Sequence, residues 1–163
     1  MSKIVVVNGA AGVGKSTFIS FCHEIDPRAI ETSTVDFVKE VAKFAGWDGV
    51  KTEKGRKFLS DLKDAMEEYN EIPNKKIDDF IRSHPDSIIF VNAREPRNIQ
   101  YYVEKYNAAT VLVQNNNAIA VKGNHADRDV ENYQYDYYIN NNKGLDNLQD
   151  LAIIFMELLK RKS

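Results

Sequence analysis

The sequence is poor in residues that would indicate a secreted or membrane protein. Cys22 is its only cysteine, which excludes an internal disulfide and a cysteine-based zinc site, and we expect it to be a buried thiol. No apolar stretch approaches the ~18 residues that a membrane span needs. The first strand is expected to begin at Lys3, so we expect no signal peptide. These absences predict a cytoplasmic protein with no membrane partner.

An excess of charge of either sign is also lacking. The formal net charge is −2, whereas a nucleic-acid binder normally has a basic face, so we expect no nucleic-acid partner. Repeats and linkers rich in proline, glycine or serine are absent as well. At 163 residues with 43% hydrophobic composition, the chain is sized for one folded domain. We therefore predict a single domain over residues 1–163.

Glycine is scarce, but three of the eight glycines fall in residues 9–16, which match the phosphate-loop pattern G-x-x-x-x-G-K-[ST] at every specified position. Such a loop points several backbone N–H groups at a phosphate, at the positive end of a helix dipole. Lys15 can reach the β- and γ-phosphates of ATP, and the Ser16 hydroxyl can bind Mg²⁺. The residues predicted to bind the ATP phosphates are Gly9, Ala10, Ala11, Gly12, Val13, Gly14, Lys15, Ser16 and Thr17.

Short apolar runs alternate with helical patterns along the rest of the chain. Buried parallel strands read as such runs, and they are expected at 4–7, 88–91, 110–113 and 135–139, with a weaker one at 29–32. Strand–helix alternation predicts an α/β fold: a P-loop three-layer sandwich, with a five-stranded parallel sheet covered by helices on both faces.

The expected helices follow from apolar periodicity and capping residues. They cover residues 14–24, a segment from about 35 to 45 capped by Ser33 or Thr34, a longer one from Glu53 that ends near Pro73, and residues 75–82. Two more are expected at 96–106, opened by Pro96, and at 148–161, opened by a capping box of Asp146 and Gln149. Residues 34–84 thus form a helical insertion after the second strand.

Other P-loop classes do not fit. The base-reading Asn-Lys-x-Asp motif of GTPase switches is missing, since Asp146 stands one place too far from Lys143, and Asp-x-x-Gly occurs nowhere. The strand that ends in Asp-Glu in motor ATPases here ends in Val91 and Asn92. The layout instead resembles the P-loop nucleoside and deoxynucleoside monophosphate kinases, the adenylate kinase-like small kinases of bacteria and phages. The segments that carry this resemblance are 9–16, 32–39, 51–63, 92–96 and 127–131.

The resemblance implies a site. In that family the insertion binds the phosphoryl acceptor, and a lid, here 114–131, covers the γ-phosphate. It implies catalytic roles for Lys15, Arg94 and Arg128, and Arg94 also stands where open α/β sheets bind ligands. The loop from Asn140 resembles the adenine-contacting loop. The residues that the resemblance implies for binding the acceptor are Asp36, Arg56, Lys63 and Arg94.

Structural roles compete with several of these assignments. Arg94 could be a surface arginine near a helix start, and Arg128 a solvated partner of Asp127 or Asp129. Arg56 and Lys63 also fit an ordinary charged helix face. Asp36 with Ser33 forms a reciprocal helix cap on sequence grounds.

One position departs from the family pattern. Asn92 stands where that family usually has an aspartate close to Mg²⁺, so either Glu95 or Asp36 supplies the charge, or metal binding and turnover are weak. The predicted function is transfer of the γ-phosphoryl group of Mg·ATP to a nucleoside monophosphate-like acceptor. Two alternatives stay open: an ATP-binding sensor with little turnover, and a kinase of a non-nucleotide phosphorylated metabolite. The sequence leaves the oligomeric state open.

Overall fold

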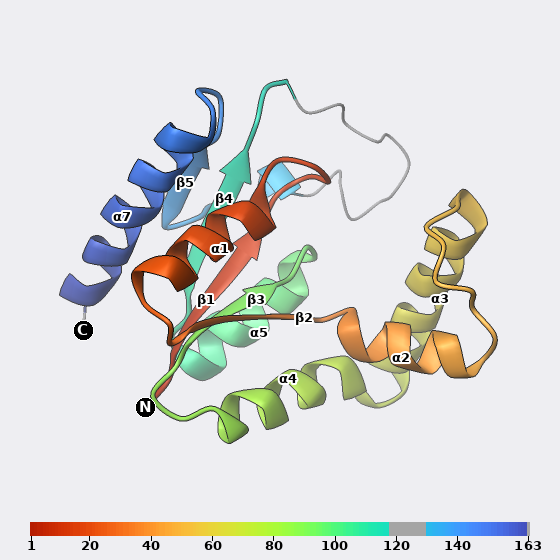
Figure 1. Cartoon of the computed structure of the whole chain (residues 1–163). Helices are drawn as coiled ribbons and strands as arrows, with labels where there is room; N and C mark the ends of the chain where they lie inside the picture. Colours follow the sequence, from red (N-terminus) through yellow and green to blue (C-terminus); the bar gives the residue numbers. More distant parts are fainter. Residues whose placement is uncertain (118–129, 163) are drawn as a thin grey trace. The chain divides into compact units, whose positions relative to one another are not determined.

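A five-stranded parallel sheet lies at the centre of the fold, with the strand order β2-β3-β1-β4-β5 (Figure 1). The structure, a computed structural model, describes residues 1–117 and 130–162. The strands are β1 (Lys3–Asn8), β2 (Ala29–Ser33), β3 (Ile88–Asn92), β4 (Ala109–Gln114) and β5 (Tyr137–Asn140). All five predicted strands are therefore present, including the weak candidate at β2.

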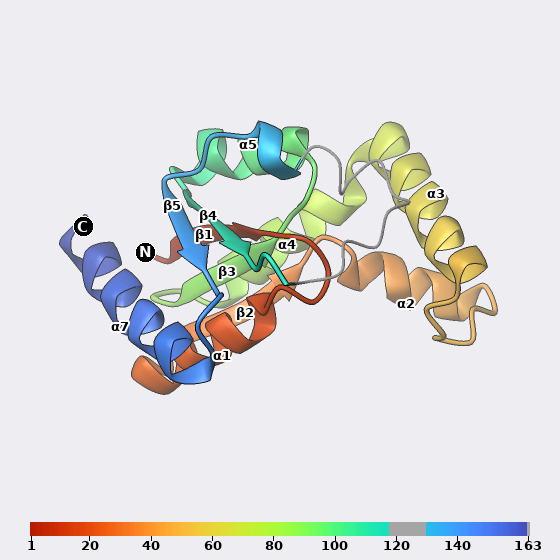
Figure 2. The same cartoon turned by 90° about the horizontal axis from the view of Figure 1, so that it is seen from above.

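Helices cover both faces of the sheet. On one face α1 (Lys15–Ile25) and α7 (Leu145–Arg161) pack against each other, and on the other α5 (Pro96–Tyr106) packs on β1 and β4 (Figure 2). The β-branched run of β1 is buried on both sides, as a central parallel strand requires. Phe18 packs edge to face against both Phe90 and Phe155 in the core between the sheet and the α1–α7 layer. The predicted three-layer α/β architecture is confirmed.

The chain divides into two compact units, which we describe separately. The sheet unit comprises Met1–Glu31 and Asp86–Ser163, and the helical unit comprises Thr32–Pro85. In the helical unit, α2 (Asp36–Phe44), α3 (Glu53–Asn70) and α4 (Ile72–Ser83) pack on one another. Its range nearly coincides with the expected insertion at 34–84. The interpretation of 1–163 as one domain stays a prediction.

Helix starts follow local chemistry. Thr52 caps α3, because its hydroxyl accepts from the Gly55 N–H at 3.0 Å. Before α2, the Ser33 N–H donates to Asp36 Oδ2 at 2.9 Å, and the Val35 N–H donates to Ser33 Oγ at 3.3 Å. These bonds close the turn before α2. The N-cap of α2 is Val35, which makes no side-chain cap bond, so the N-cap predicted at Ser33 or Thr34 was wrong.

Three other boundary predictions were wrong. Pro73 lies in the first turn of α4 instead of ending the longer helix. The longer helix ends before Glu71, whose φ of 55° interrupts the helical backbone, and a proline in the first turn of a helix loses no hydrogen bond. The last helix starts at Leu145 after Gly144, so Asp146 is a first-turn residue and makes no capping box. The fifth strand starts at Tyr137 and not at residue 135. Among the described residues, no helix has both the length and the apolar character to cross a membrane.

Candidate functional site

The phosphate-loop residues connect β1 to α1 at the carboxyl edge of the sheet. Gly9 has a φ of +149°, and a Cβ there would lie 2.4 Å from the Val113 carbonyl oxygen of β4. Gly14 has a φ of +101°, and its Cβ would lie 2.5 Å from Asn141 Nδ2. Both positions therefore demand glycine, for conformation and for space. These two residues are the glycines that the sequence motif specifies.

The Lys15 side chain folds back over this loop. Its Nζ donates to the carbonyl oxygens of Gly9 at 2.6 Å and Ala10 at 2.9 Å. Lys15 begins α1, and the first turn of that helix contains no acidic residue to offset the positive end of its dipole. Ser16 and Thr17 lie exposed in the same turn. A cation, exposed hydroxyls and a helix N-terminus thus meet at one loop, which suits an anionic ligand.

Arg94 lies in the connection that follows β3, next to the strand that leads into this loop. It follows β3, which pairs directly with β1, and the connections after these two strands lead to helices on opposite faces (Figure 2). In open α/β sheets ligands bind where neighbouring connections diverge in this way. Arg94 is half-buried. The structure therefore places Arg94 and the phosphate loop at the same sheet edge, as the sequence predicts.

Sequence reasoning missed Asn8, which connects these two segments. It ends β1, is completely buried, and its Oδ1 accepts from the Gly9 N–H at 2.8 Å. Its Nδ2 donates to the Arg94 carbonyl oxygen at 3.0 Å and to the Tyr135 hydroxyl at 2.9 Å. Burial raises the pKa of Tyr135 to about 12, so this hydroxyl keeps its proton and donates to the Val130 carbonyl at 2.9 Å. A polar residue at the end of an apolar strand was the available signal.

Glu31 is a second residue that the sequence did not identify. Asn92 Nδ2 donates to Glu31 Oε1 at 2.5 Å, so the carboxylate beside the end of β3 comes from β2. The expectation that Glu95 or Asp36 supplies charge near Mg²⁺, or that metal binding and turnover are weak, stays a prediction. Glu95 accepts from Arg97 Nε at 3.0 Å, and Asp36 accepts from the Ser33 N–H. No motif points to Glu31, because its place depends on which strand lies next to β3.

The Ser16 hydroxyl and the Glu31 carboxylate are oxygen donors of the kind that a hard cation binds. Mg²⁺ takes oxygen ligands and usually keeps several waters, with one or two carboxylates from the protein. The Ser16 hydroxyl is exposed in the first turn of α1, and the Glu31 carboxylate is held by Asn92. The donor types therefore fit Mg²⁺, with Ser16 as the ligand that the motif predicts.

At the other end of the loop, Asn141, the residue after Asn140, contacts the phosphate loop. Asn141 Nδ2 donates to the Val13 carbonyl oxygen at 2.9 Å, and its N–H donates to the Gln114 carbonyl at 2.8 Å. Asn140 is the exposed last residue of β5. The segment after β5 thus contacts the phosphate loop through Asn141, while a role of Asn140 in ATP binding stays a prediction.

The remaining acceptor candidates belong to the helical unit. Arg56 is exposed on α3, and Asp36 is the first residue of α2. Lys63 is buried, and its Nζ lies 3.1 Å from Glu67 Oε1 one turn further along α3. Its charge is therefore already balanced within the helix. The acceptor roles of all three residues stay predictions.

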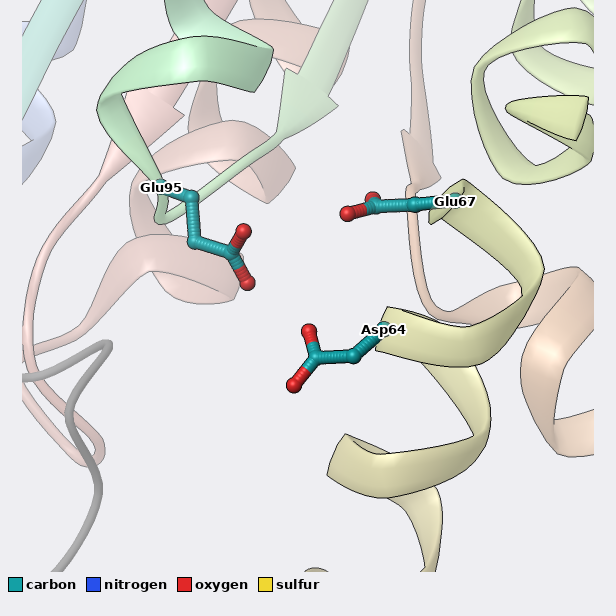
Figure 3. A group of neighbouring side chains, drawn as sticks. All are labelled: Asp64, Glu67 and Glu95. Carbon is teal, nitrogen blue, oxygen red and sulfur yellow. The ribbon is translucent and has the colours of Figure 1, made fainter. Parts of the chain in front are cut away.

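Carboxylates also gather on α3. Asp64 and Glu67 lie one turn apart with their side chains on the same side of the helix (Figure 3). The same figure draws Glu95, which belongs to the sheet unit and precedes α5. Glu67 is buried and already paired with Lys63, so we assign no metal to Asp64 and Glu67.

Two other predictions have different outcomes. Cys22 is completely buried on α1, and burial raises its pKa to about 12, which confirms the expected inert thiol. Arg128 and most of the expected lid at 114–131 lie outside the described residues.

Fold and loop together define the class: a P-loop α/β sandwich. Two solved structures share it over nearly their whole length. Shikimate kinase from Aquifex aeolicus matches with a TM-score of 0.59 at 12% identity, over 98% of this chain and 99% of that chain. An unliganded sugar kinase from Janibacter sp. HTCC2649 matches with a TM-score of 0.50 at 13% identity, over 96% and 95%. No protein-family model matches the chain, and a search of curated proteins gives no match.

Proposed function

We propose that this protein is a P-loop phosphotransferase that moves the γ-phosphoryl group of Mg·ATP to a small acceptor. The observation that carries the proposal is Lys15, whose ammonium is held over the phosphate loop by the Gly9 and Ala10 carbonyls. Two structures with the same fold are a shikimate kinase and a sugar kinase, which supports a kinase-type reaction.

The residues divide the work of transfer. Backbone N–H groups of residues 9–16 bind the phosphates, and Lys15 exchanges its carbonyl partners for phosphate oxygens. Arg94 neutralises negative charge on the transferred group from the neighbouring strand end. Magnesium held by Ser16 would supply further charge neutralisation. Since no protein nucleophile is needed, catalysis comes from positioning and electrostatics.

Two acceptor classes follow from different grounds. The resemblance of the sequence favours a nucleoside monophosphate, with Asp36, Arg56 and Lys63 contributing from the helical unit. The two structural neighbours are a shikimate kinase and a sugar kinase, which favours a non-nucleotide metabolite as the acceptor. We retain both, because each predicts a different active acceptor in one assay.

The first test is ADP release from Mg·ATP against nucleoside monophosphates, deoxynucleoside monophosphates, shikimate and sugars. The Lys15→Ala variant is expected to lower acceptor-dependent turnover by about three orders of magnitude or more, since a charge-assisted contact to the reacting phosphate is lost. Lys160→Ala, an exposed lysine near the end of α7, is the matched control and should leave the rate unchanged. Equal turnover in Lys15→Ala and the wild type would remove the proposal.

A second candidate is an ATP-binding sensor with little turnover. The observation in its favour is Asn92, an amide held by Glu31 where the resembling kinases have an aspartate. Silence across the acceptor panel together with Lys15-dependent ATP binding would select it.

A further inference from the structure

Asn8 is the buried polar residue on which two loops of the site converge. It is 0% exposed, and the four residues before it in β1 are buried and apolar. A buried amide is unfavourable unless its donors and acceptor are all bonded. Here Oδ1 accepts one bond and Nδ2 donates two, so the side chain is fully satisfied by this arrangement of its neighbours.

These bonds join segments that are distant in sequence. The Gly9 N–H is the first amide of the phosphate loop, and the Arg94 carbonyl lies 86 residues away from Asn8. The Tyr135 hydroxyl, 127 residues away, accepts from Asn8 and donates to the Val130 carbonyl, which belongs to the turn Val130–Asn132. One amide group therefore fixes the spacing between the loop that binds phosphate and the residue that carries the Arg94 side chain.

We propose that Asn8 is a positioning residue for phosphoryl transfer, and that through Tyr135 it communicates nucleotide binding to the turn Val130–Asn132. This inference rests on the proposed function. Asn8 acts through Gly9 and Arg94, and it does not contact the reacting phosphate itself. A misplacement of about 1 Å at a transfer site costs on the order of a hundredfold in rate, which is the effect that this amide prevents.

The donor and acceptor roles of the Asn8 side chain determine which substitution tests the proposal. Asn8→Asp keeps the acceptor for the Gly9 N–H but replaces the Nδ2 donor with an oxygen that faces the Arg94 carbonyl. Tyr135→Phe is milder, because it removes only the hydroxyl between Asn8 and Val130. Tyr133→Phe is the matched control: it removes a nearby hydroxyl whose contact is to Gln100, at 3.5 Å.

Two measurements separate positioning from a general loss of structure. In Asn8→Asp, kcat is expected to fall about 10- to 100-fold while the Kd for Mg·ATP changes less than about threefold, because the Gly9 contact survives. In amide NMR spectra, Mg·ATP is expected to shift the resonances of Arg94 and Asn132 in the wild type and in Tyr133→Phe. The Asn132 shift should be lost in Asn8→Asp and reduced by at least half in Tyr135→Phe. The Arg94 shift should change only in Asn8→Asp, because Asn8 donates directly to the Arg94 carbonyl.

The outcomes are distinguishable. A wild type that binds no Mg·ATP overturns the proposed function, and this inference with it. Normal ATP binding with unaltered shifts and kcat in Asn8→Asp overturns the inference alone. If Asn8→Asp does not fold, Tyr135→Phe decides: a wild-type shift at Asn132 in this variant overturns the inference.

Discussion

At the scale of single residues, the edge of the sheet is organised by side-chain amides. Asn8, Asn92 and Asn141 each bind a group from a different segment: a loop backbone, a carboxylate on β2, and the carbonyl of Val13. An amide offers donors and an acceptor together, so it can connect two segments that carry unlike groups. Asn8 and Asn141 therefore make neutral hydrogen bonds, Asn92 binds the charged Glu31 carboxylate, and Lys15 and Arg94 are the cations of this edge.

Replacing Asn92 tests how far this pairing determines stability. Asn92→Asp would place a second carboxylate 2.5 Å from Glu31 Oε1, where the wild type has a donor. We expect a loss of about 1–2 kcal/mol in unfolding free energy at pH 8. The loss should be smaller at pH 5, because two adjacent carboxylates can share a proton as the pH falls. Thermal unfolding at both pH values measures the difference.

The double variant Glu31→Gln/Asn92→Asp is the control for this prediction. It restores one donor and one carboxylate with their positions exchanged, so most of the stability at pH 8 should return. Glu31→Gln alone separates the loss of charge from the exchange. An Asn92→Asp protein as stable as the wild type at pH 8 would show that the Glu31 contact is not maintained in solution.

At the scale of elements, α1 is joined to the segment after β5 through the phosphate loop. Gly14 precedes α1 with a φ of +101°, and a Cβ there would lie 2.5 Å from Asn141 Nδ2. The same amide binds the Val13 carbonyl. Gly12 has a positive φ of +77° as well, but a Cβ there would meet nothing within 4 Å. A substitution at Gly12 therefore tests backbone strain alone, whereas one at Gly14 tests strain together with steric crowding.

We expect Gly12→Ala to cost about 1 kcal/mol in unfolding free energy, the strain of a left-handed residue. Gly14→Ala should cost about 1–2 kcal/mol more, because the Asn141 amide must leave Val13. Urea denaturation measures both. In the background of Asn141→Ala, the extra cost of Gly14→Ala should disappear, and equal costs in both backgrounds would contradict the predicted contact.

The elements also show what the sequence could predict. Apolar runs locate β1, β3 and β4 clearly because these central parallel strands are buried on both faces, whereas the edge strands β2 and β5 are only partly buried and give a weaker pattern or a displaced start. Pro96 gives the start of α5 without error. The phosphate loop was predictable because its pattern combines conformation and chemistry in eight consecutive residues. Asn8 and Glu31 were not found, since their partners lie 61 to 127 residues away and only strand order brings them close. Pro73 was misassigned because a proline ends one helix and begins another equally well.

At the scale of the whole molecule, the two compact units differ in what stabilises them. The sheet unit contains a core of large buried side chains that includes Phe18, Phe90 and Phe155. The buried apolar side chains of the helical unit are smaller and fewer: Val38, Ala42, Pro73, Ile77 and Ile81. Because burial of apolar area is the main source of stability, the helical unit should be the less stable of the two.

Trp47 makes this difference measurable, because it is the only tryptophan in the chain and belongs to the helical unit. Its Nε1 donates to the Val50 carbonyl at 3.3 Å beside Gly55, so its emission reports whether that turn is folded. In urea we expect the fluorescence transition to precede the circular dichroism transition by about 0.5 M or more, since unlike stabilities give separate midpoints. Because α2, α3 and α4 also contribute to circular dichroism, Ile77→Ala should lower the fluorescence midpoint more than the circular dichroism midpoint, whereas Phe155→Ala should lower chiefly the circular dichroism midpoint. Coincident transitions in the wild type and in both variants would mean that the units unfold as one.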